Sequence, residues 1–137
     1  MYKKQNKTRD NYQTRGAKNR LISLLVLQKW ILKTNTINGE YTIPKKLPNG
    51  HQYRLDSYFV SPEGDHYIVE IDGQYHFTKQ QMQKTLFRDD WLTNYFKGIG
   101  IKINIVHLSP DDLYSIFRLT KDEIMHRIIH ADMYRAF

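Results

Sequence analysis

The spacing of the apolar residues changes from helical to extended and back along the chain, which limits the folds open to it. Residues 15–33 carry apolar side chains at i, i+3 and i+4 steps, and this spacing returns over residues 79–96. Between them, residues 53–60 and 66–72 are rich in aromatic and β-branched side chains. Residues 61–65 (Ser-Pro-Glu-Gly-Asp) form a turn, so the pattern predicts two helices flanking a β-hairpin.

The remaining segments extend the same alternation. Residues 101–106 follow Gly98 and Gly100 and predict a third main strand, and residues 41–43 predict a short one. Ser109-Pro110 and the capping box from Thr120 to Glu123 each predict a C-terminal helix. This order indicates the α/β class, a mixed sheet flanked by helices. In the helix over 79–96, one apolar face is expected, made of Met82, Leu86, Phe87, Trp91, Tyr95 and Ile99.

The composition excludes several classes of protein. A chain of 137 residues is long enough for one domain with a single core. The absence of cysteine excludes disulfides, thiolate catalysis and cysteine zinc sites. The longest apolar run, residues 21–27, is far shorter than the roughly 20 residues of a membrane span. The polar N-terminus lacks the apolar segment of a signal peptide, so we expect a cytoplasmic protein, in the host cytoplasm if phage-encoded.

The positive charge is concentrated at the N-terminus. Residues 1–20 hold seven Lys or Arg and one acid, whereas the remaining 117 residues hold 14 basic and 13 acidic residues. We therefore expect a flexible basic arm over residues 1–14 and one domain over residues 15–137. Such an arm suits a polyanion such as DNA, although a solubilising tail is the alternative, and it has no apolar face for a membrane. The candidate phosphate contacts are Lys3, Lys4, Lys7, Arg9 and Arg15.

Three carboxylates are predicted to meet on one face of the hairpin. Asp56 lies inside the first strand, although aspartate is a poor strand former. Glu70 and Asp72 occupy alternate positions of the second strand, so their side chains point to the same face. A turn at residues 61–65 brings Asp56 opposite Glu70 or one pair away.

A cation is needed to hold such acids together, because buried like charges repel. Mg²⁺ or Mn²⁺ takes oxygen ligands and leaves positions for water and phosphate. An ion of this kind polarises a phosphoryl oxygen and activates the attacking water. The acids therefore predict a metal site for phosphodiester hydrolysis, with His76 as general base, phosphate donor or further ligand. Gly73 allows the chain to bend where a substrate backbone approaches.

Residues around these acids are candidates for contact with nucleic acid. Arg88 and Lys84 lie on the helix after His76 and are placed to meet phosphates, and Tyr75 and Phe77 are placed to stack on bases. The alternatives are a solvated ion-pair neighbour for Arg88 and core positions for the two aromatics. His126 and His130 have the i, i+4 spacing of a two-histidine metal site, but no third ligand is near them in sequence. We interpret them as surface residues.

The run Glu70-Ile71-Asp72-Gly73-Gln74-Tyr75-His76, with Asp56 before it and Arg88-Asp89-Asp90-Trp91-Leu92 after it, resembles the PD-(D/E)XK nuclease superfamily. The likeness is to its very-short-patch-repair-endonuclease-like branch and to some phage and homing endonucleases, and it spans about residues 15–108. The resemblance implies a restriction-endonuclease-like core with a four-stranded mixed sheet and Mg²⁺-dependent cleavage of DNA. It implies Asp56 and Glu70 as metal ligands, with Asp72 and His76 completing the site.

Two positions depart from the family pattern. Asp72 stands where members commonly have a lysine, so the role of that lysine would pass to His76, Gln74, Gln83 or Lys84. Lys18 and Asn19 lie near the position where related chains have a glutamate. Three hypotheses follow: a DNA endonuclease, a catalytically inactive nucleic-acid-binding or regulatory protein of the same fold, and a protein whose acids only form salt bridges. A domain with a single site cuts both strands of DNA most easily as a homodimer or in two successive events.

Overall fold

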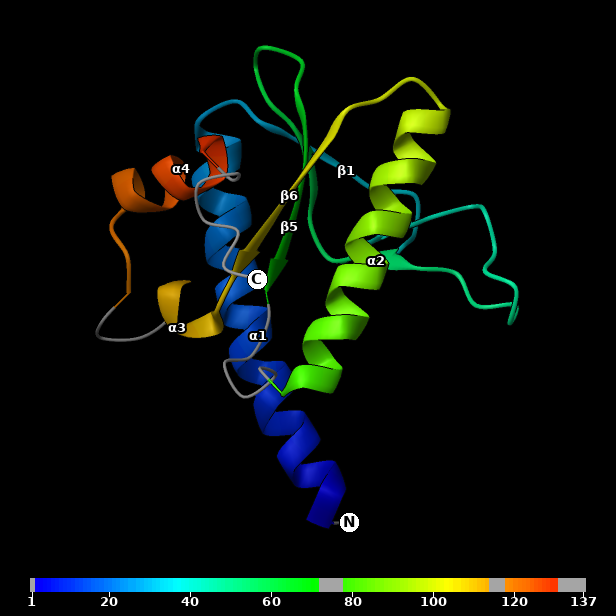
Figure 1. Ribbon diagram of the computed structural model, residues 1–137. Coiled ribbons are helices and arrows are strands. Elements are labelled where there is room, and N and C mark those ends of the chain that lie inside the picture. The colour runs from blue at the N-terminus through cyan, green and yellow to red at the C-terminus, as the bar shows by residue number, and fades with distance from the viewer. Residues whose placement is uncertain (1, 72–77, 114–117, 131–137) are drawn as a thin grey trace.

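The computed structural model describes residues 2–71, 78–113 and 118–130, with side chains from residue 15 onward. Figure 1 shows a sheet between long helices on either side. The elements in chain order are α1 (Tyr2–Leu27), β1 (Ile31–Lys33), β2 (Tyr41–Thr42), β3 (Arg54–Leu55), β4 (Tyr58–Val60), β5 (His66–Ile71), α2 (Lys79–Gly98), β6 (Ile103–Leu108), α3 (Pro110–Leu113) and α4 (Lys121–Ile129).

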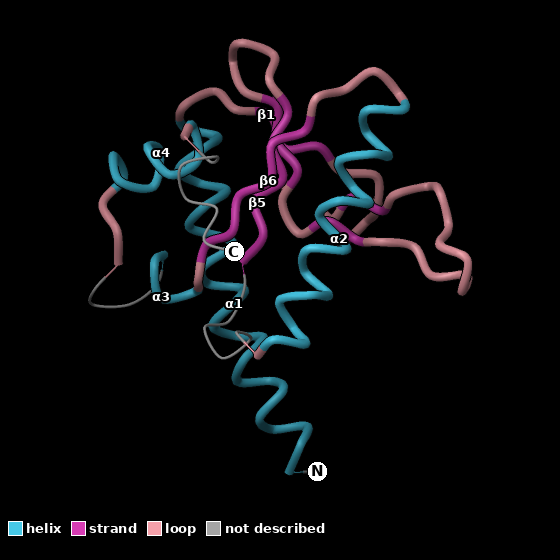
Figure 2. Tube along the Cα trace, in the orientation of Figure 1, coloured by secondary structure: helices cyan, strands magenta, loops and turns pink. Residues whose placement is uncertain are grey.

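The main sheet has four strands in the order β1-β4-β5-β6. β1 and β4 are antiparallel, as are β4 and β5, whereas β5 and β6 are parallel and joined through α2. A parallel pair needs such a crossover, and a helix is its usual form. The predicted α/β class with a four-stranded mixed sheet is therefore confirmed. β2 and β3 form a separate two-stranded sheet, whose connecting loop projects beyond α2 (Figure 2).

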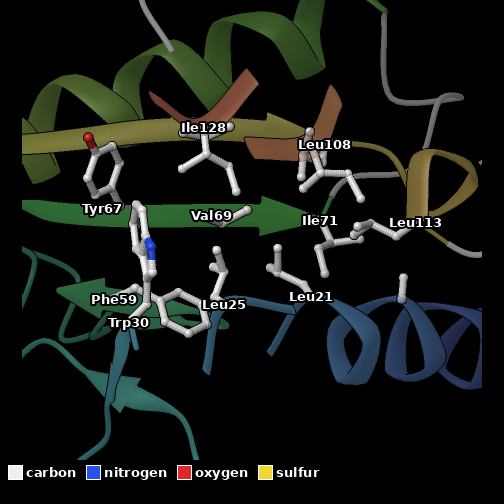
Figure 3. Close-up of a cluster of buried hydrophobic side chains, with 13 residues drawn as sticks. Leu21, Leu25, Trp30, Phe59, Tyr67, Val69, Ile71, Leu108, Leu113 and Ile128 are labelled. Atoms are coloured by element: carbon white, nitrogen blue, oxygen red, sulfur yellow. The ribbon is translucent and has the colours of Figure 1, made fainter. Parts of the chain in front are cut away.

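Two apolar clusters cover the two faces of the main sheet. Alternate residues of β5 belong to different clusters: Tyr67, Val69 and Ile71 face one way and Ile68 the other. The first cluster joins the sheet to α1, α3 and α4 (Figure 3), and its α1 members are Ala17, Leu21 and Leu25. The second cluster joins the opposite face to α2 and to the β2–β3 sheet. Glu70 is therefore directed toward α2 by the same alternation.

The first helix ends earlier than its apolar spacing predicts. The expected helix over residues 15–33 is wrong at its end, because α1 stops at Leu27 and β1 follows. The amides of Lys29 and Trp30 donate to the carbonyls of Val26 and Leu25, with Lys29 left-handed at φ 68°. These two bonds form a Schellman motif, which satisfies the last carbonyls and turns the chain. At the other end, α1 includes the backbone of residues 2–14; the flexibility of the basic arm stays a prediction.

The predicted strand over residues 53–60 is divided in two. Arg54–Leu55 pairs with β2, Tyr58–Val60 pairs with β5, and the chain bends at Asp56. The first part thus joins a different sheet, which local propensity does not reveal. The turn over residues 61–65 is confirmed, since the amide of Ser61 donates to the carbonyl of Asp65 and Gly64 has a φ of 90°. The third main strand lies two residues later than predicted, at Ile103–Leu108.

The apolar face predicted for α2 is wrong in part, because only Trp91 and Tyr95 of its members pack against the second cluster. Leu86, Phe87 and Ile99 are 43%, 63% and 55% exposed, whereas Leu92 and Phe96 are buried against the sheet. One turn before Leu92, the same stripe continues into Arg88 and Asp89, whose side chains contact groups of the sheet. Because sheet-facing positions of α2 carry charge, a search for apolar residues alone does not identify the face of the helix that lies against the sheet.

The C-terminal helices begin as predicted. The hydroxyl of Thr120 accepts from the amide of Glu123, and the Glu123 carboxylate accepts from the amide of Thr120, which completes the capping box of α4. At α3, the Ser109 hydroxyl accepts from the amide of Asp112, and the Asp112 carboxylate accepts from the amide of Ser109. Among the described residues, no helix is long and apolar enough to cross a membrane.

The corrected orientation of α2 leads to a stability prediction. Leu92→Ala is expected to lower the free energy of unfolding by about 3 kcal/mol, because it removes a fully buried side chain and leaves a cavity. Leu86→Ala, the same change on the exposed side of the same helix, is expected to cost less than about 1 kcal/mol. Urea unfolding followed by circular dichroism measures both, and equal losses would contradict the observed orientation.

Candidate functional site

The candidate site is one end of the β4–β5 hairpin, which holds Glu70 in β5 and Asp56 in the bend before β4. The β4–β5 register pairs Tyr58 with Ile68, and the amide of Val69 donates to the carbonyl of Ser57 at 2.9 Å. If the pairing continued by one residue beyond Ser57 and Val69, Asp56 would lie opposite Glu70. Asp56 is half-buried in the bend before β4, and Glu70 lies next to the last residue of β5. Glu70 in β5 and Asp56 in the bend before β4 therefore both lie toward the end of β5 that leads into residues 72–77.

The buried carboxylate of Glu70 is compensated by a cation from α2. Only 4% of its side chain is exposed, and Arg88 Nη1 lies 2.9 Å from Glu70 Oε1, as an ion pair rather than an aligned hydrogen bond. Arg88 Nη2 also donates to the carbonyl of Arg54 at 2.9 Å, and the guanidinium lies 5.3 Å from the centre of the Tyr53 ring. Arg88 thus links α2, β5 and β3, a role that neither sequence interpretation anticipated.

A second polar pair, His107 and Asp89, lies beside the first. His107 is the register partner of Glu70 on β6, and its Nε2 is 2.7 Å from Asp89 Oδ2. Asp89 Oδ1 is buried and has no hydrogen-bond partner among the described residues. Sequence reasoning missed this pair, although alternation with Ile103 and Ile105 places His107 on the face of the sheet toward α2. The helical step from Leu92 to Asp89 is the matching signal in α2.

The donor set suits a hard divalent ion only in part. The carboxylates of Asp56, Glu70 and Asp89 are oxygen ligands of the kind that Mg²⁺ and Mn²⁺ take. The buried Asp89 Oδ1 is one oxygen without a hydrogen bond in the described part of the chain. However, no three His, Asp or Glu side chains of the described residues are grouped to hold a metal ion. Asp72 and His76, the other predicted members of the site, lie outside the described residues, as do Gln74, Tyr75 and Phe77.

The other predicted contacts are spread over the molecule. Lys84 and Gln83 are exposed on α2, and Arg15 is exposed on α1 near the half-buried Lys18. The side chains of Lys3, Lys4, Lys7 and Arg9 lie outside the described part of α1. His126 and His130 are exposed with ring centres 4.5 Å apart, so their interpretation as surface residues is confirmed.

Tyr58 lies two residues beyond Asp56 on β4, but its ionisation excludes it as a base near neutral pH. Burial, followed by the nearby phenols of Tyr41 and Tyr95, raises the pKa of Tyr58 to about 12. The protonated hydroxyl shares a 2.5 Å hydrogen bond with His66 Nδ1. Burial therefore favours the protonated phenol of Tyr58, which supports the sheet through its hydrogen bond with His66.

The Glu70–Arg88 contact leads to a prediction about coupling. Arg88→Met is expected to lower the free energy of unfolding by about 3 kcal/mol, because it leaves a buried carboxylate without its cation. Adding Glu70→Gln should recover part of that loss, so the double variant is less destabilised than the sum of the single ones. Arg54→Met, at an exposed arginine, is the matched control and should change little. Additive losses in urea unfolding at pH 7 would contradict the coupling.

The raised pKa of Tyr58 predicts a loss of stability at high pH. The unfolded chain releases this proton near pH 10 and the folded protein near pH 12, so this contribution is complete below pH 10 and is lost as the pH rises to about 12. The difference in unfolding free energy between the wild type and Tyr58→Phe should therefore shrink over that range. Parallel stability curves for the two proteins from pH 9 to pH 12 would contradict the prediction.

Comparisons with known proteins add no assignment to this site. No family model matches the chain, no curated protein matches it, and no solved structure matches it. The roles of Asp56, Glu70 and the residues around them therefore depend on their geometry and chemistry.

Proposed function

We propose that the protein is a metal-dependent nuclease that hydrolyses phosphodiester bonds in DNA. The observation that carries the proposal is that the buried Glu70 and the half-buried Asp56 both lie toward the same end of the β4–β5 hairpin. One of these acids is almost completely buried, and both precede the segment that contains Asp72 and His76. Buried ionisable groups are costly and gather at functional sites, so their concentration at one end of the sheet indicates chemistry there.

The fold supports this proposal at the level of architecture. A four-stranded mixed sheet flanked by helices is what the resemblance to the PD-(D/E)XK superfamily implies. The two acids of its motif are Asp56, in the bend before β4, and Glu70, in β5. We extend the proposal to a restriction-endonuclease-like core, with Asp56 and Glu70 as metal ligands and Asp72 as the third.

The roles of the side chains follow from their charges and contacts. When bound, Mg²⁺ or Mn²⁺ would polarise the phosphoryl oxygen and lower the pKa of the attacking water. Arg88 supplies a positive charge beside Glu70, where it compensates the acid and attracts a phosphate oxygen. Asp89 Oδ2 orients the imidazole of His107 through Nε2, so this pair can hold a proton beside Glu70. His76 keeps its proposed role as general base or phosphate donor.

One observation favours a second candidate, a nucleic-acid-binding protein of this fold without catalysis. The ion pair with Arg88 already compensates the charge of Glu70, so burial of this acid does not by itself require a metal. The presence of Asp72 in place of the usual lysine also favours the non-catalytic candidate. Cleavage separates the two candidates, because both predict binding to DNA.

Cleavage assays test the proposal. We would incubate the protein with supercoiled plasmid, single-stranded DNA, a branched junction and RNA, each with Mg²⁺, Mn²⁺ or EDTA. Cleavage of DNA that requires the ion is expected, and Asp56→Asn and Glu70→Gln should each reduce its rate at least about 100-fold, because each removes a charged ligand.

Two exposed acids provide matched controls for these variants. Asp90→Asn on α2 and Glu63→Gln in the β4–β5 turn make the same chemical changes away from the site and should retain the wild-type rate. Circular dichroism verifies that every variant is folded. Absence of metal-dependent cutting by the wild type, or equal cutting by the site variants, would refute the nuclease and leave the non-catalytic candidate.

A further inference from the structure

The segment that leads into Asp56 is a basic hairpin, formed by residues 41–55 with β2 and β3 at its base. It contains Lys45, Lys46 and Arg54 and no acid, whereas the chain beyond residue 20 is otherwise close to neutral. All three cationic side chains are exposed. The hairpin therefore presents an uncompensated positive charge of three, and its base adjoins the candidate site through the bond from Arg88 to the carbonyl of Arg54.

Hydrogen bonds hold this basic hairpin in a defined shape. Beyond the β2–β3 pairs, the amide of Ile43 donates to the carbonyl of Tyr53 at 2.9 Å, and that of Leu47 donates to the carbonyl of His51 at 2.7 Å. Gln52 Nε2 donates to the carbonyls of Ile43 and Pro44. At the base, the Asn35 side chain exchanges two hydrogen bonds with the backbone of Thr42. An ordered projection loses little conformational entropy on binding.

The basic hairpin is also fixed to the candidate site. Arg88, the partner of Glu70, donates to the carbonyl of Arg54 and lies over the ring of Tyr53. The Tyr53 ring packs edge-on against Trp91 of α2, with centres 5.2 Å apart. One side chain thus contacts both the buried acid and the hairpin. In Figure 1, the loop of the hairpin extends beyond α2, away from the rest of the protein.

We infer that the basic hairpin is a DNA-binding element that enters the major groove of a duplex, with its cations on the flanking phosphates. The major groove of B-DNA, about 12 Å wide, admits a two-stranded β-ribbon. Lys45 and Lys46 lie in the loop after β2, and Arg54 lies on β3, two residues before Asp56. A duplex held in this way brings its backbone to the acids. The inference deepens the proposed nuclease function and rests on it for the identity of the polyanion.

The same features favour duplex DNA over other polyanions. The major groove of A-form RNA is too deep and narrow for side chains to read, so an RNA duplex would not accept the ribbon. An anionic membrane is also disfavoured, because the tip of the hairpin, Pro48-Asn49-Gly50, has no large apolar side chain to insert. The lysines would contact phosphates, and such contacts do not depend on the sequence of the DNA.

Binding without cleavage tests the inference. We would measure the affinity of the full chain for a fluorescent 20-bp DNA duplex in EDTA over a range of salt concentrations. Lys45→Gln/Lys46→Gln should weaken binding about tenfold near 0.15 M salt. It should also lower the slope of log K against log salt by about two, because each lysine lost removes about one phosphate contact.

A charge-matched pair serves as the control. Lys102→Gln/Lys121→Gln removes the same charge from exposed positions before β6 and at the start of α4, and it should bind nearly as the wild type does. Equal weakening by the two double variants, or no weakening by the hairpin variant, would overturn the inference. Tighter lysine-dependent binding to an RNA duplex of the same sequence, or to phosphatidylserine vesicles, would overturn the choice of DNA.

The outcomes for the hairpin and for the nuclease are separable, because this assay contains no divalent ion. If the wild type cuts DNA and the hairpin variant binds normally, only the hairpin inference fails. If binding depends on Lys45 and Lys46 but no substrate is ever cut, the hairpin stands and the nuclease proposal fails. Thermal unfolding of each double variant confirms that the exposed substitutions leave the fold unchanged.

Discussion

A carboxylate buried at the end of β5 determines much of the structure around it. Glu70 is surrounded by strands and by α2, and such an acid keeps its charge only if an opposite charge or hydrogen-bond donors reach it. Arg88 provides that charge at 2.9 Å, which constrains the rotation of α2 about its axis. Once Arg88 faces the sheet, Asp89 follows on the next position and meets His107. The ion pair between Glu70 and Arg88 is thus linked both to the orientation of α2 and to the position of the Asp89–His107 pair.

The two faces of the main sheet differ in the kinds of side chain that pack on them. The cluster between the sheet and α1, α3 and α4 includes large, fully buried side chains such as Phe59, Leu21 and Ile128. Burial of these apolar side chains stabilises the fold through the hydrophobic effect. The face toward α2 is apolar near Ile103 and Phe96 but becomes charged toward the far end of β5. A rigid apolar layer behind the strands can hold charged groups in place on the other side.

The bend at Asp56 connects the site to the surface. Because the chain leaves the β2–β3 sheet at Leu55 and enters the main sheet at Tyr58, Asp56 lies between the basic hairpin and the acid-bearing strand. Arg88 bonds to both sides of this junction. A polyanion on the hairpin and an ion or phosphate at Glu70 would therefore act on the same arginine, which couples the binding of substrate to the charge balance of the site.

The sequence by itself determined the elements that depend on local chemistry. Residue patterns located α2 and β5, the turn over residues 61–65 joined β4 to β5, and Thr120 with Glu123 began α4. The Glu-x-Asp-Gly run at residues 70–73 indicated the end of β5 as the candidate site. These features are encoded within a few residues of one another, where propensity, turn chemistry and capping decide the conformation.

Only the tertiary structure decided the rest, because it depends on partners distant in sequence. The apolar spacing of residues 15–33 continued into what became β1, since strand pairing with β4 outweighs helix propensity beyond the Schellman turn. The residues of α2 facing the sheet include two charged ones, and their burial is tolerable only because Glu70 and His107 lie opposite them. The ion pair of Arg88 joins positions 18 residues apart, as does the bond from Asp89 to His107. Periodicity does not disclose such compensation, so the polar cluster at the centre of the candidate site depends on the packing of the helix on the sheet.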